Sequence, residues 1–366
     1  MRSRVRIVLW SAVLVLSSAG LSLGDGEAKE PIVPELTPVP TMTATTVPAD
    51  GDVNPYGVAF VPHGFPDGDV AHPGDILVSN FNNSGNAQGT GTTIVAVSPK
   101  GETSLFFQGS MAPGALGLTT ALGVLRQGFV LVGSVPTLSG AVQPPGELLI
   151  LDRNGKEVLS LVDATLLDGP WDLTISEEGE RAAVFVSNVL SGTVTRLDLR
   201  VSKNDGVVVE SLTQIASGYF TRPDPAALVV GPTGLAYDRD KDILYVASTG
   251  DNAIFAISKA RRRQGDAGMG RLIYKDDAHL RGPLGLVLAP NGDLISTNGD
   301  AVNPDPAQPS EIVEFTTSGH FVAEMPVDTS GQQGGAFGIA LARVRGEIVL
   351  AAVDDIFNTL EVWAVK

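Results

Sequence analysis

The stretch GPTGLAYDRDKDILYVASTGDNAIFAISK, Gly231–Lys259, decides the fold. It contains three short apolar runs separated by the turn segments RDKD and GDN, and LIYKDD (Leu272–Asp277) supplies a fourth run. β-Branched and aromatic residues fill the runs, whereas Gly, Asp and Asn fill the turns, as is typical of strands in an antiparallel meander. No helical period persists over a helix-length window, so we expect four short strands and no βαβ unit.

The opening phrase of this stretch recurs along the whole chain. The copies are NPYGVAF (Asn54–Phe60), GALGLTT (Gly114–Thr120), GPWDLTI (Gly169–Ile175), GPTGLAY (Gly231–Tyr237), GPLGLVL (Gly282–Leu288) and GAFGIAL (Gly335–Leu341). Their centres are Gly57, Gly117, Asp172, Gly234, Gly285 and Gly338, spaced 51 to 62 residues apart. Six repeats of four strands predict an all-β fold, a six-bladed β-propeller of four-stranded antiparallel blades. Gly at five of the six centres indicates that the first strands approach closely around a crowded axis.

The repeat also divides the chain. We expect a signal peptide over 1–24, where Arg2, Arg4 and Arg6 precede the apolar run Ile7–Leu16; an uncleaved membrane anchor is the alternative. Residues 25–53 are rich in Pro and Thr, and 54–366 form the propeller, with blades starting near residues 54, 114, 169, 231, 282 and 335.

The last blade lacks its outermost strand in this scheme, because the chain ends with the third run of that blade, TLEVWAVK (Thr359–Lys366). Closing the ring removes exposed sheet edges. We therefore expect part of Ile32–Val47 to pair beside Glu361–Val365 as the closing strand. A linker without a strand is the alternative.

Composition limits the function. The chain has 366 residues and a formal net charge of −16, and such a surface repels phosphate backbones, so nucleic acid is not an expected partner. Cysteine is absent, which excludes disulfides, thiolate metal sites and a cysteine nucleophile. With the signal removed, we expect a soluble monomer without stable membrane insertion, secreted or periplasmic, whose partner is a small ligand or another exported protein.

Two segments carry a family resemblance. YVASTGDNAIFAI (Tyr245–Ile257), preceded by GPTGLAYD, resembles a blade of the NHL-repeat proteins, and VFVSNVLSGTVTRLDL (Val184–Leu199) is similar to the same blade or to a YncE-like variant. The resemblance covers about residues 54–366. It implies the propeller fold but no single activity, because propellers of this kind host many functions.

Polar residues stop the second run of each blade. They are Asn80, Ser134, Asn188, Ser248 or Thr249, Asn298 and Asp354. By symmetry these side chains should form a ring at one mouth of the axial channel, with Asp172 near the same axis. Oxygen-rich rings suit Ca²⁺, and the first ligand candidates are Asp172, Asn188, Asn298 and Asp354. The alternative is that Asn and Asp only end strands and start turns.

A second resemblance, to gluconolactonase-like six-bladed calcium hydrolases, gives the enzyme hypothesis. It implies an axial metal held by Glu, Asn and Asp that polarises a lactone or ester carbonyl or activates water. This sequence departs from that pattern, since Asn54 stands where the family has Glu, and Gly299 and Asp300 after Asn298 match only in part. No complete set of catalytic residues is predicted.

Three long segments follow second strands and should rise from one face: Phe81–Thr93, Val135–Glu147 and Asn298–Glu311. Long loops on one face mark a binding face. We therefore expect a binding protein that recognises a small ligand or a protein partner at this face. The alternatives are the calcium-dependent hydrolase and an envelope scaffold. The candidate ligand-binding residues are Asn80, Trp171, Asp172, Asn188, Thr249, Asn298 and Asp354.

One basic cluster, RRRQGDAGMGR (Arg261–Arg271), lies between the third and fourth runs of the fourth blade. It is either a solvated excursion at the rim or a docking patch for an acidic partner.

Overall fold

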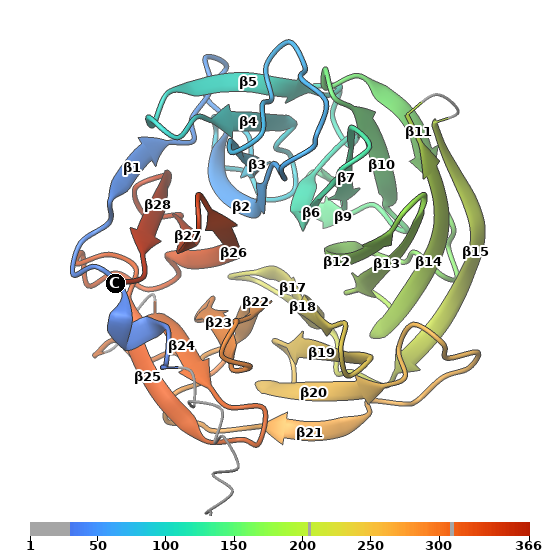
Figure 1. Ribbon diagram of the computed structural model, residues 1–366. Coiled ribbons are helices and arrows are strands. Elements are labelled where there is room, and N and C mark those ends of the chain that lie inside the picture. The colour runs from blue at the N-terminus through green and yellow to red at the C-terminus, as the bar shows by residue number, and fades with distance from the viewer. Residues whose placement is uncertain (1–29, 204–205, 308–310) are drawn as a thin grey trace, which may run out of the picture.

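Six four-stranded antiparallel sheets surround a central axis in the computed structural model, which describes residues 30–203, 206–307 and 311–366 (Figure 1). The first strands, next to the axis, are β2 (Val53–Phe60), β6 (Leu118–Leu125), β12 (Pro170–Glu178), β18 (Pro232–Asp238), β22 (Pro283–Leu288) and β26 (Ala336–Val344). The second strands are β3 (Ile76–Asn82), β7 (Phe129–Ser134), β13 (Arg181–Asn188), β19 (Ile243–Ser248), β23 (Leu294–Asn298) and β27 (Glu347–Asp354).

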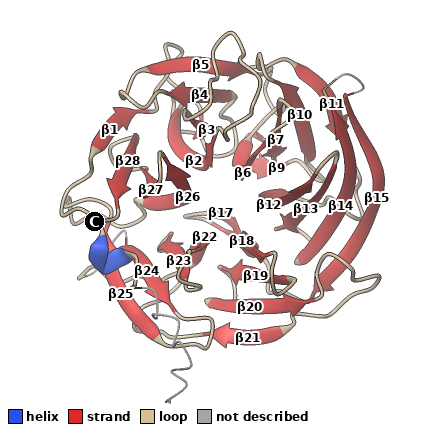
Figure 2. Ribbon diagram, viewed as in Figure 1, coloured by secondary structure: helices blue, strands red, loops and turns tan. Residues whose placement is uncertain are grey.

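The outer strands complete each blade. The third strands are β4 (Thr93–Val97), β10 (Glu147–Asp152), β14 (Thr193–Ser202), β20 (Ala253–Ser258), β24 (Glu311–Phe315) and β28 (Thr359–Ala364). The outermost strands are β5 (Thr103–Gln108), β11 (Glu157–Leu161), β15 (Gly206–Ser217), β21 (Arg271–Tyr274), β25 (Phe321–Pro326) and β1 (Met42–Thr45). The single helical element is a 3-10 turn, η1 (Val33–Glu35), among the described residues (Figure 2). The predicted six-bladed propeller is confirmed.

The N-terminal segment closes the ring, as the sequence predicts. Strand β1 runs antiparallel to β28, with Met42 opposite Val362 and Thr45 opposite Thr359. A further bridge joins Leu36 to Val365. The last blade therefore takes its outermost strand from the opposite end of the chain. The predicted signal peptide, residues 1–24, lies outside the described residues.

A buried carboxylate fixes the segment ahead of the closing strand. Glu314, on β24, has no exposed surface, and its two oxygens accept hydrogen bonds from the backbone N–H groups of Ile32 (2.9 Å) and Val33 (2.7 Å). Its Oε1 also accepts from the Asn291 side chain at 3.0 Å. Hydrogen bonds to a carboxylate are stronger than neutral ones, so Glu314 anchors the closing segment to the fifth blade.

We expect Glu314→Gln to lower the free energy of unfolding by about 1–3 kcal/mol, because one oxygen acceptor becomes an N–H donor facing a backbone N–H. Urea denaturation of the full chain measures this. The control is Glu157→Gln, at an exposed position on β11, which should change stability by less than about 0.5 kcal/mol. Equal effects of the two substitutions would contradict the anchoring role of Glu314.

The first strands lie close together around the axis. The space around the centre residues shows how near neighbouring strands approach one another. In all six blades the pairing register between first and second strands shifts beside the centre, which is a β-bulge. A Cβ on Gly285 would lie 2.7 Å from the carbonyl oxygen of Phe337 in the next blade, and a Cβ on Gly338 would overlap the carbonyl of Tyr56. The predicted reason for Gly is confirmed at Gly57, Gly234, Gly285 and Gly338. It is wrong for Gly117, which precedes β6 and whose Cβ would meet the carbonyls of Gly89 and Val135 in the loops, so that Thr120 takes the place beside the axis in the second blade.

Apolar clusters fill the space between neighbouring blades. One of them joins Leu77 and Ile94 of the first blade to Leu122 and Val132 of the second, and equivalent clusters lie between later blades.

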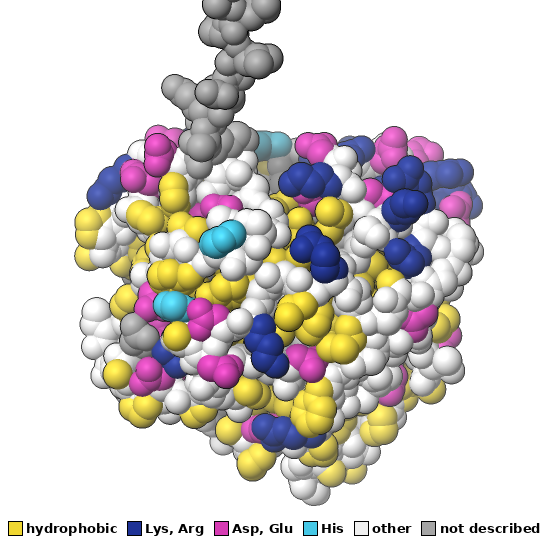
Figure 3. All heavy atoms as spheres, turned by 90° about the horizontal axis from the view of Figure 1, so that it is seen from below, with side chains coloured by type: hydrophobic (Ala, Val, Ile, Leu, Met, Phe, Trp, Pro, Cys, Tyr) yellow, Lys and Arg dark blue, Asp and Glu magenta, His cyan; other side chains and the backbone are white. Residues whose placement is uncertain are grey.

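Figure 3 views the rim that lies at the bottom of Figure 1, where acidic, basic and apolar side chains are interspersed. None of the helices in the described part of the chain is long and apolar enough to cross a membrane.

Candidate functional site: an axial well closed at one end

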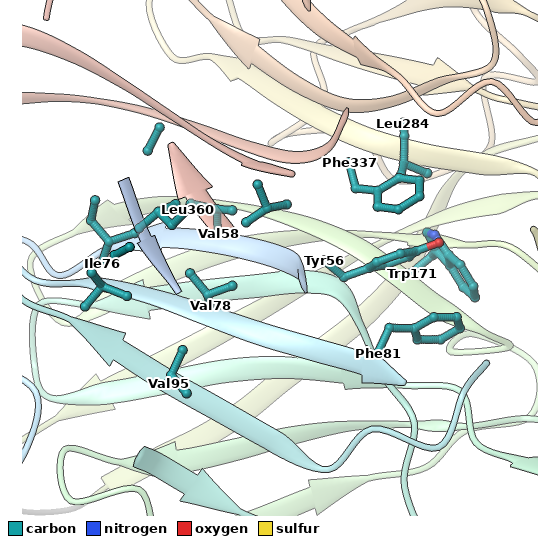
Figure 4. Packing of buried hydrophobic residues seen from close by; sticks show 14 of the residues in the cluster. Tyr56, Val58, Ile76, Val78, Phe81, Val95, Trp171, Leu284, Phe337 and Leu360 are labelled. Carbon is teal, nitrogen blue, oxygen red and sulfur yellow. The ribbon is translucent and has the colours of Figure 1, made fainter. Parts of the chain in front are cut away.

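The mouth at which the second strands end is filled by side chains. Tyr56, Phe81, Trp171, Leu284 and Phe337 pack there over the axis, and we call these five residues the aromatic plug. Tyr56 lies between Phe81 and Phe337, at ring-centroid distances of 4.6 and 4.7 Å, and Trp171 meets Phe81 edge-on at 5.5 Å (Figure 4). A void of about 20 Å³ lies beside the plug.

The long loops cover this plug. The backbone N–H of Thr137 donates to the carbonyl of Gly89 at 2.8 Å, which joins the first two loops. A hairpin of β16 (Arg222–Asp224) and β17 (Leu228–Val230) also reaches the axis, where Val229 packs in the same apolar cluster as the plug. These loops gather at one mouth, as the sequence predicts. The mouth beneath them is closed by the aromatic plug.

The opposite mouth is open. A cavity of about 290 Å³ lies on the axis below the plug, and a second cavity of about 1010 Å³ lies beyond it, where the first strands turn into the second. The two cavities share lining residues, including Leu122, Leu173 and Thr174, so they form one space that narrows inward. We call this space the axial well. Its walls are the inner edges of the six first strands.

Asp172 lies at the narrow end of the well. It lines the inner cavity, and its Oδ1 accepts the backbone N–H of Leu173 at 2.6 Å. Burial deep inside the protein raises the pKa of this carboxyl well above its ordinary value, although the side chain keeps surface in the cavity. Four of the other five blades have Gly at this position and the second blade has Thr120, so Asp172 is the single acid at this level of the repeat.

The wide end of the well carries the opposite charge. Arg126, Arg343 and Arg345 line it together with His63, and Glu347 is the acid among its lining residues. Arg126 lies 3.9 Å from Glu177 and its side chain is 70% exposed, so its charge is largely screened by solvent.

The repeated Asn residues join the second strand of a blade to the segment that leads into the first strand of the same blade. Each of them donates a side-chain hydrogen bond to a carbonyl in the segment leading into the first strand of its own blade. Asn80 donates to Thr46 (3.0 Å), Asn188 to Leu166 (3.1 Å) and Asn298 to His279 (2.9 Å). All three Asn side chains are fully buried. These hydrogen bonds engage the Nδ2 groups and explain the repetition, whereas the Oδ1 atoms of Asn80 and Asn188 are buried without a hydrogen-bond partner among the described residues.

The remaining candidates also have partners within the fold. The Thr249 hydroxyl donates to the carbonyl of Pro283 at 2.7 Å, across the boundary between the fourth and fifth blades. Asp354 accepts the backbone N–H of Ile356 at 2.9 Å and so shapes the turn after β27. Trp171 belongs to the aromatic plug. Of the seven candidate residues, Asp172 is the one that lines the axial well.

The four expected calcium ligands do not converge. Asn188 and Asn298 are engaged within their own blades, Asp354 caps a turn, and Asp172 lies in the well. Nowhere in the described ranges do three or more acidic, His or Cys side chains group as a metal would require. Ca²⁺ needs six to eight oxygen ligands, so these residues as arranged do not fit the metal.

We expect Asn188→Ala to lower the free energy of unfolding by about 2 kcal/mol, because the carbonyl of Leu166 loses its buried donor. The loss should be the same in EDTA and in excess Ca²⁺, measured by urea denaturation. A dose-dependent rise of the unfolding midpoint with Ca²⁺ that Asn188→Ala or Asp172→Ala abolishes would instead establish an axial metal.

Two neighbouring acids after β27 have raised pKa values. Burial raises the pKa of Asp355 to about 7, and the adjacent charge of Asp354 adds to the effect. Burial also raises the pKa of Asp354 to about 6, with a further contribution from Asp328. Because the folded pKa exceeds the ordinary value, the ionised forms are disfavoured in the folded protein. Their contribution to stability is fully present below about pH 4 and is lost as the pH rises through 6 to 7.

We expect Asp355→Asn to reduce this loss. Its free energy of unfolding should fall less than that of the unchanged chain between pH 4 and pH 8, and should exceed it at pH 8 by on the order of 1 kcal/mol. Chemical denaturation across this range measures both quantities. Asp240→Asn, at an exposed position, is the control and should keep the original pH dependence.

The basic cluster is engaged in the fold. Arg261 donates to the Ser176 hydroxyl at 3.2 Å, and Arg262 donates to Asp242 at 2.9 Å. The backbone carbonyl of Arg263 accepts from the buried Arg196 at 2.8 Å. The contacts of Arg261 and Arg263 join the third and fourth blades, and that of Arg262 lies within the fourth, so the cluster has a structural role.

The fold and the axial cavity define this chain as a six-bladed β-propeller with a central well. The solved structures it is similar to include a gluconolactonase from Xanthomonas campestris (TM-score 0.54, 14% identity, 92% of this chain and 100% of that chain). A second is the major allergen Mala s 1 of Malassezia sympodialis (TM-score 0.53, 15% identity, 79% and 89% covered). A luciferin-regenerating enzyme matches with TM-score 0.50 and 10% identity, over 89% of this chain and 95% of its own.

The likeness is one of fold. No protein-family model matches the chain, and no curated protein matches it in sequence.

Sequence reasoning missed the aromatic plug. Its signal was present, because Tyr56, Trp171, Leu284 and Phe337 each stand one position before a repeat centre.

Proposed function

We propose that this protein binds a small molecule in the axial well, which the molecule enters through the open mouth. The observation that carries this proposal is the continuous cavity, closed at its inner end by the aromatic plug and open at the other. Cavities of about 300–1,000 Å³ are typical of small-molecule sites.

The lining indicates a ligand with both polar and apolar parts. The inner edges of first strands present backbone N–H and C=O groups that need partners. Aliphatic side chains such as Leu122, Leu173 and Leu286 lie between them. A ligand that forms a few hydrogen bonds and also buries an apolar body suits such a lining.

We expect Thr174→Trp to abolish binding, since Thr174 is half-buried and lines the junction of the two cavities. The probes are phenethyl alcohol, phenethylamine and hydrocinnamate, which are neutral, cationic and anionic versions of one small aromatic body. Titration calorimetry and ligand-observed NMR at neutral pH and millimolar concentration measure binding.

The control is Thr329→Trp, at an exposed loop position that lines no part of the well. It should bind every probe as the unchanged chain does. The proposal is wrong if none of the three probes binds the unchanged chain, or if Thr174→Trp, shown to be folded by circular dichroism, binds them equally well.

Calcium-dependent hydrolysis of lactones or esters is the second candidate. The fold likeness to a gluconolactonase supports it, whereas the separated positions of Asp172, Asn188, Asn298 and Asp354 do not. The Ca²⁺ titration described above decides between them.

We further propose that the protein works as a monomer outside the cytoplasm. The basic and apolar pattern of residues 1–24 supports the location.

A further inference from the structure

We propose that the ligand of the axial well carries a primary or secondary amine, and that Asp172 binds its ammonium group. This inference rests on the proposed function, since it names the chemistry of the molecule that the well receives.

The position of Asp172 is the first observation. The inner cavity, of about 290 Å³, is lined mainly by aliphatic side chains, Gly and Thr, and Asp172 is the one ionisable acid among them. Four of the five equivalent positions are Gly, and the fifth is Thr120. The fold therefore does not need a carboxyl group at this level of the axis. We infer that the carboxyl group of Asp172 interacts with a molecule bound in the well.

The lack of a counter-ion is the second observation. Asp172 accepts hydrogen bonds from the backbone N–H groups of Leu173 and Leu235, and among the residues described no Lys, Arg or His offsets its charge. A buried carboxylate without an opposite charge is unfavourable. An ammonium group would supply that charge and up to three N–H donors, and charge-assisted hydrogen bonds are the stronger kind.

The arginines at the wide end do not cancel this preference. Arg343 lies beyond Gly338 along β26, so it is roughly 17 Å from the level of Asp172 at 3.3 Å per residue. That distance exceeds the screening length of about 8 Å at physiological ionic strength. Arg343 and Arg345 are also exposed to solvent. Their charge acts at the wide end, whereas Asp172 lies at the narrow end, where a bound ammonium group would favour the ionised form of its carboxyl group.

The test compares phenethylamine with phenethyl alcohol and hydrocinnamate by titration calorimetry at neutral pH. The amine should bind the unchanged chain at least about tenfold more tightly than the alcohol. Asp172→Asn keeps the Oδ1 acceptor for Leu173 but removes the charge, so it should weaken the amine by about tenfold or more and change the alcohol by less than about threefold.

Two further variants keep the test decisive. Asp172→Gly installs the residue that four of the other five blades have at this position, and should behave as Asp172→Asn does even if the latter folds poorly. Asp168→Asn makes the same change of net charge at a half-buried position outside the well, and should leave amine binding unchanged.

The outcomes separate the two proposals. If Thr174→Trp abolishes binding but the alcohol binds as tightly as the amine, the well binds ligands and the amine inference is overturned. Tighter binding of hydrocinnamate overturns it in favour of recognition by the arginines at the wide end. If no probe binds, both proposals fail. Amine selectivity that Asp172→Asn and Asp172→Gly remove, and that Asp168→Asn keeps, supports the inference.

Discussion

The close approach of six first strands around one axis is the constraint on which the rest of the structure depends. Adjacent first strands come near enough that a side chain at Gly338 would overlap the backbone of Tyr56. Hydroxyl groups hold this spacing: Ser79 donates to the carbonyl of Thr119 at 2.9 Å in the next blade, and Thr233 donates to Pro283 at 3.0 Å. Small and hydroxylated residues therefore recur where the blades meet, whatever the protein binds.

The same crowding determines which mouth is open. In four blades the residue before the centre packs at the end where the long loops gather, and Tyr56, Trp171 and Phe337 are large enough to fill it together. Beyond the centres lies the wide end of the well, and Phe60 is the one Phe, Tyr or Trp among the described residues that line it. The channel thus becomes a well, and a residue at a centre position lies at its floor. Asp172 occupies that place.

The sequence predicted the features that depend on periodicity. Blade number, the positions of Gly at four of the five predicted centres and the need for a closing strand all follow from counting repeats, and the pairing of Met42 with Val362 agrees. Gly117 was misplaced, because the second blade reaches the axis three residues later, at Thr120. The roles of Asn80 and Asn188 could not be predicted, because their hydrogen-bond partners, Thr46 and Leu166, lie in irregular segments without a repeat. The open mouth was also beyond prediction, since it depends on how the side chains of the plug pack.

Departures from an internal repeat separate structural from functional residues in this chain. A polar residue that recurs at the end of second strands, such as Asn298, repeats because every blade must join that strand to the segment ahead of it. An acidic residue at one blade only, where four of the others have Gly and one has Thr120, has no such reason. Asp172 is that residue, and burial makes its charge costly in the folded protein. A group that is costly, unrepeated and in contact with a cavity is best explained by what enters the cavity.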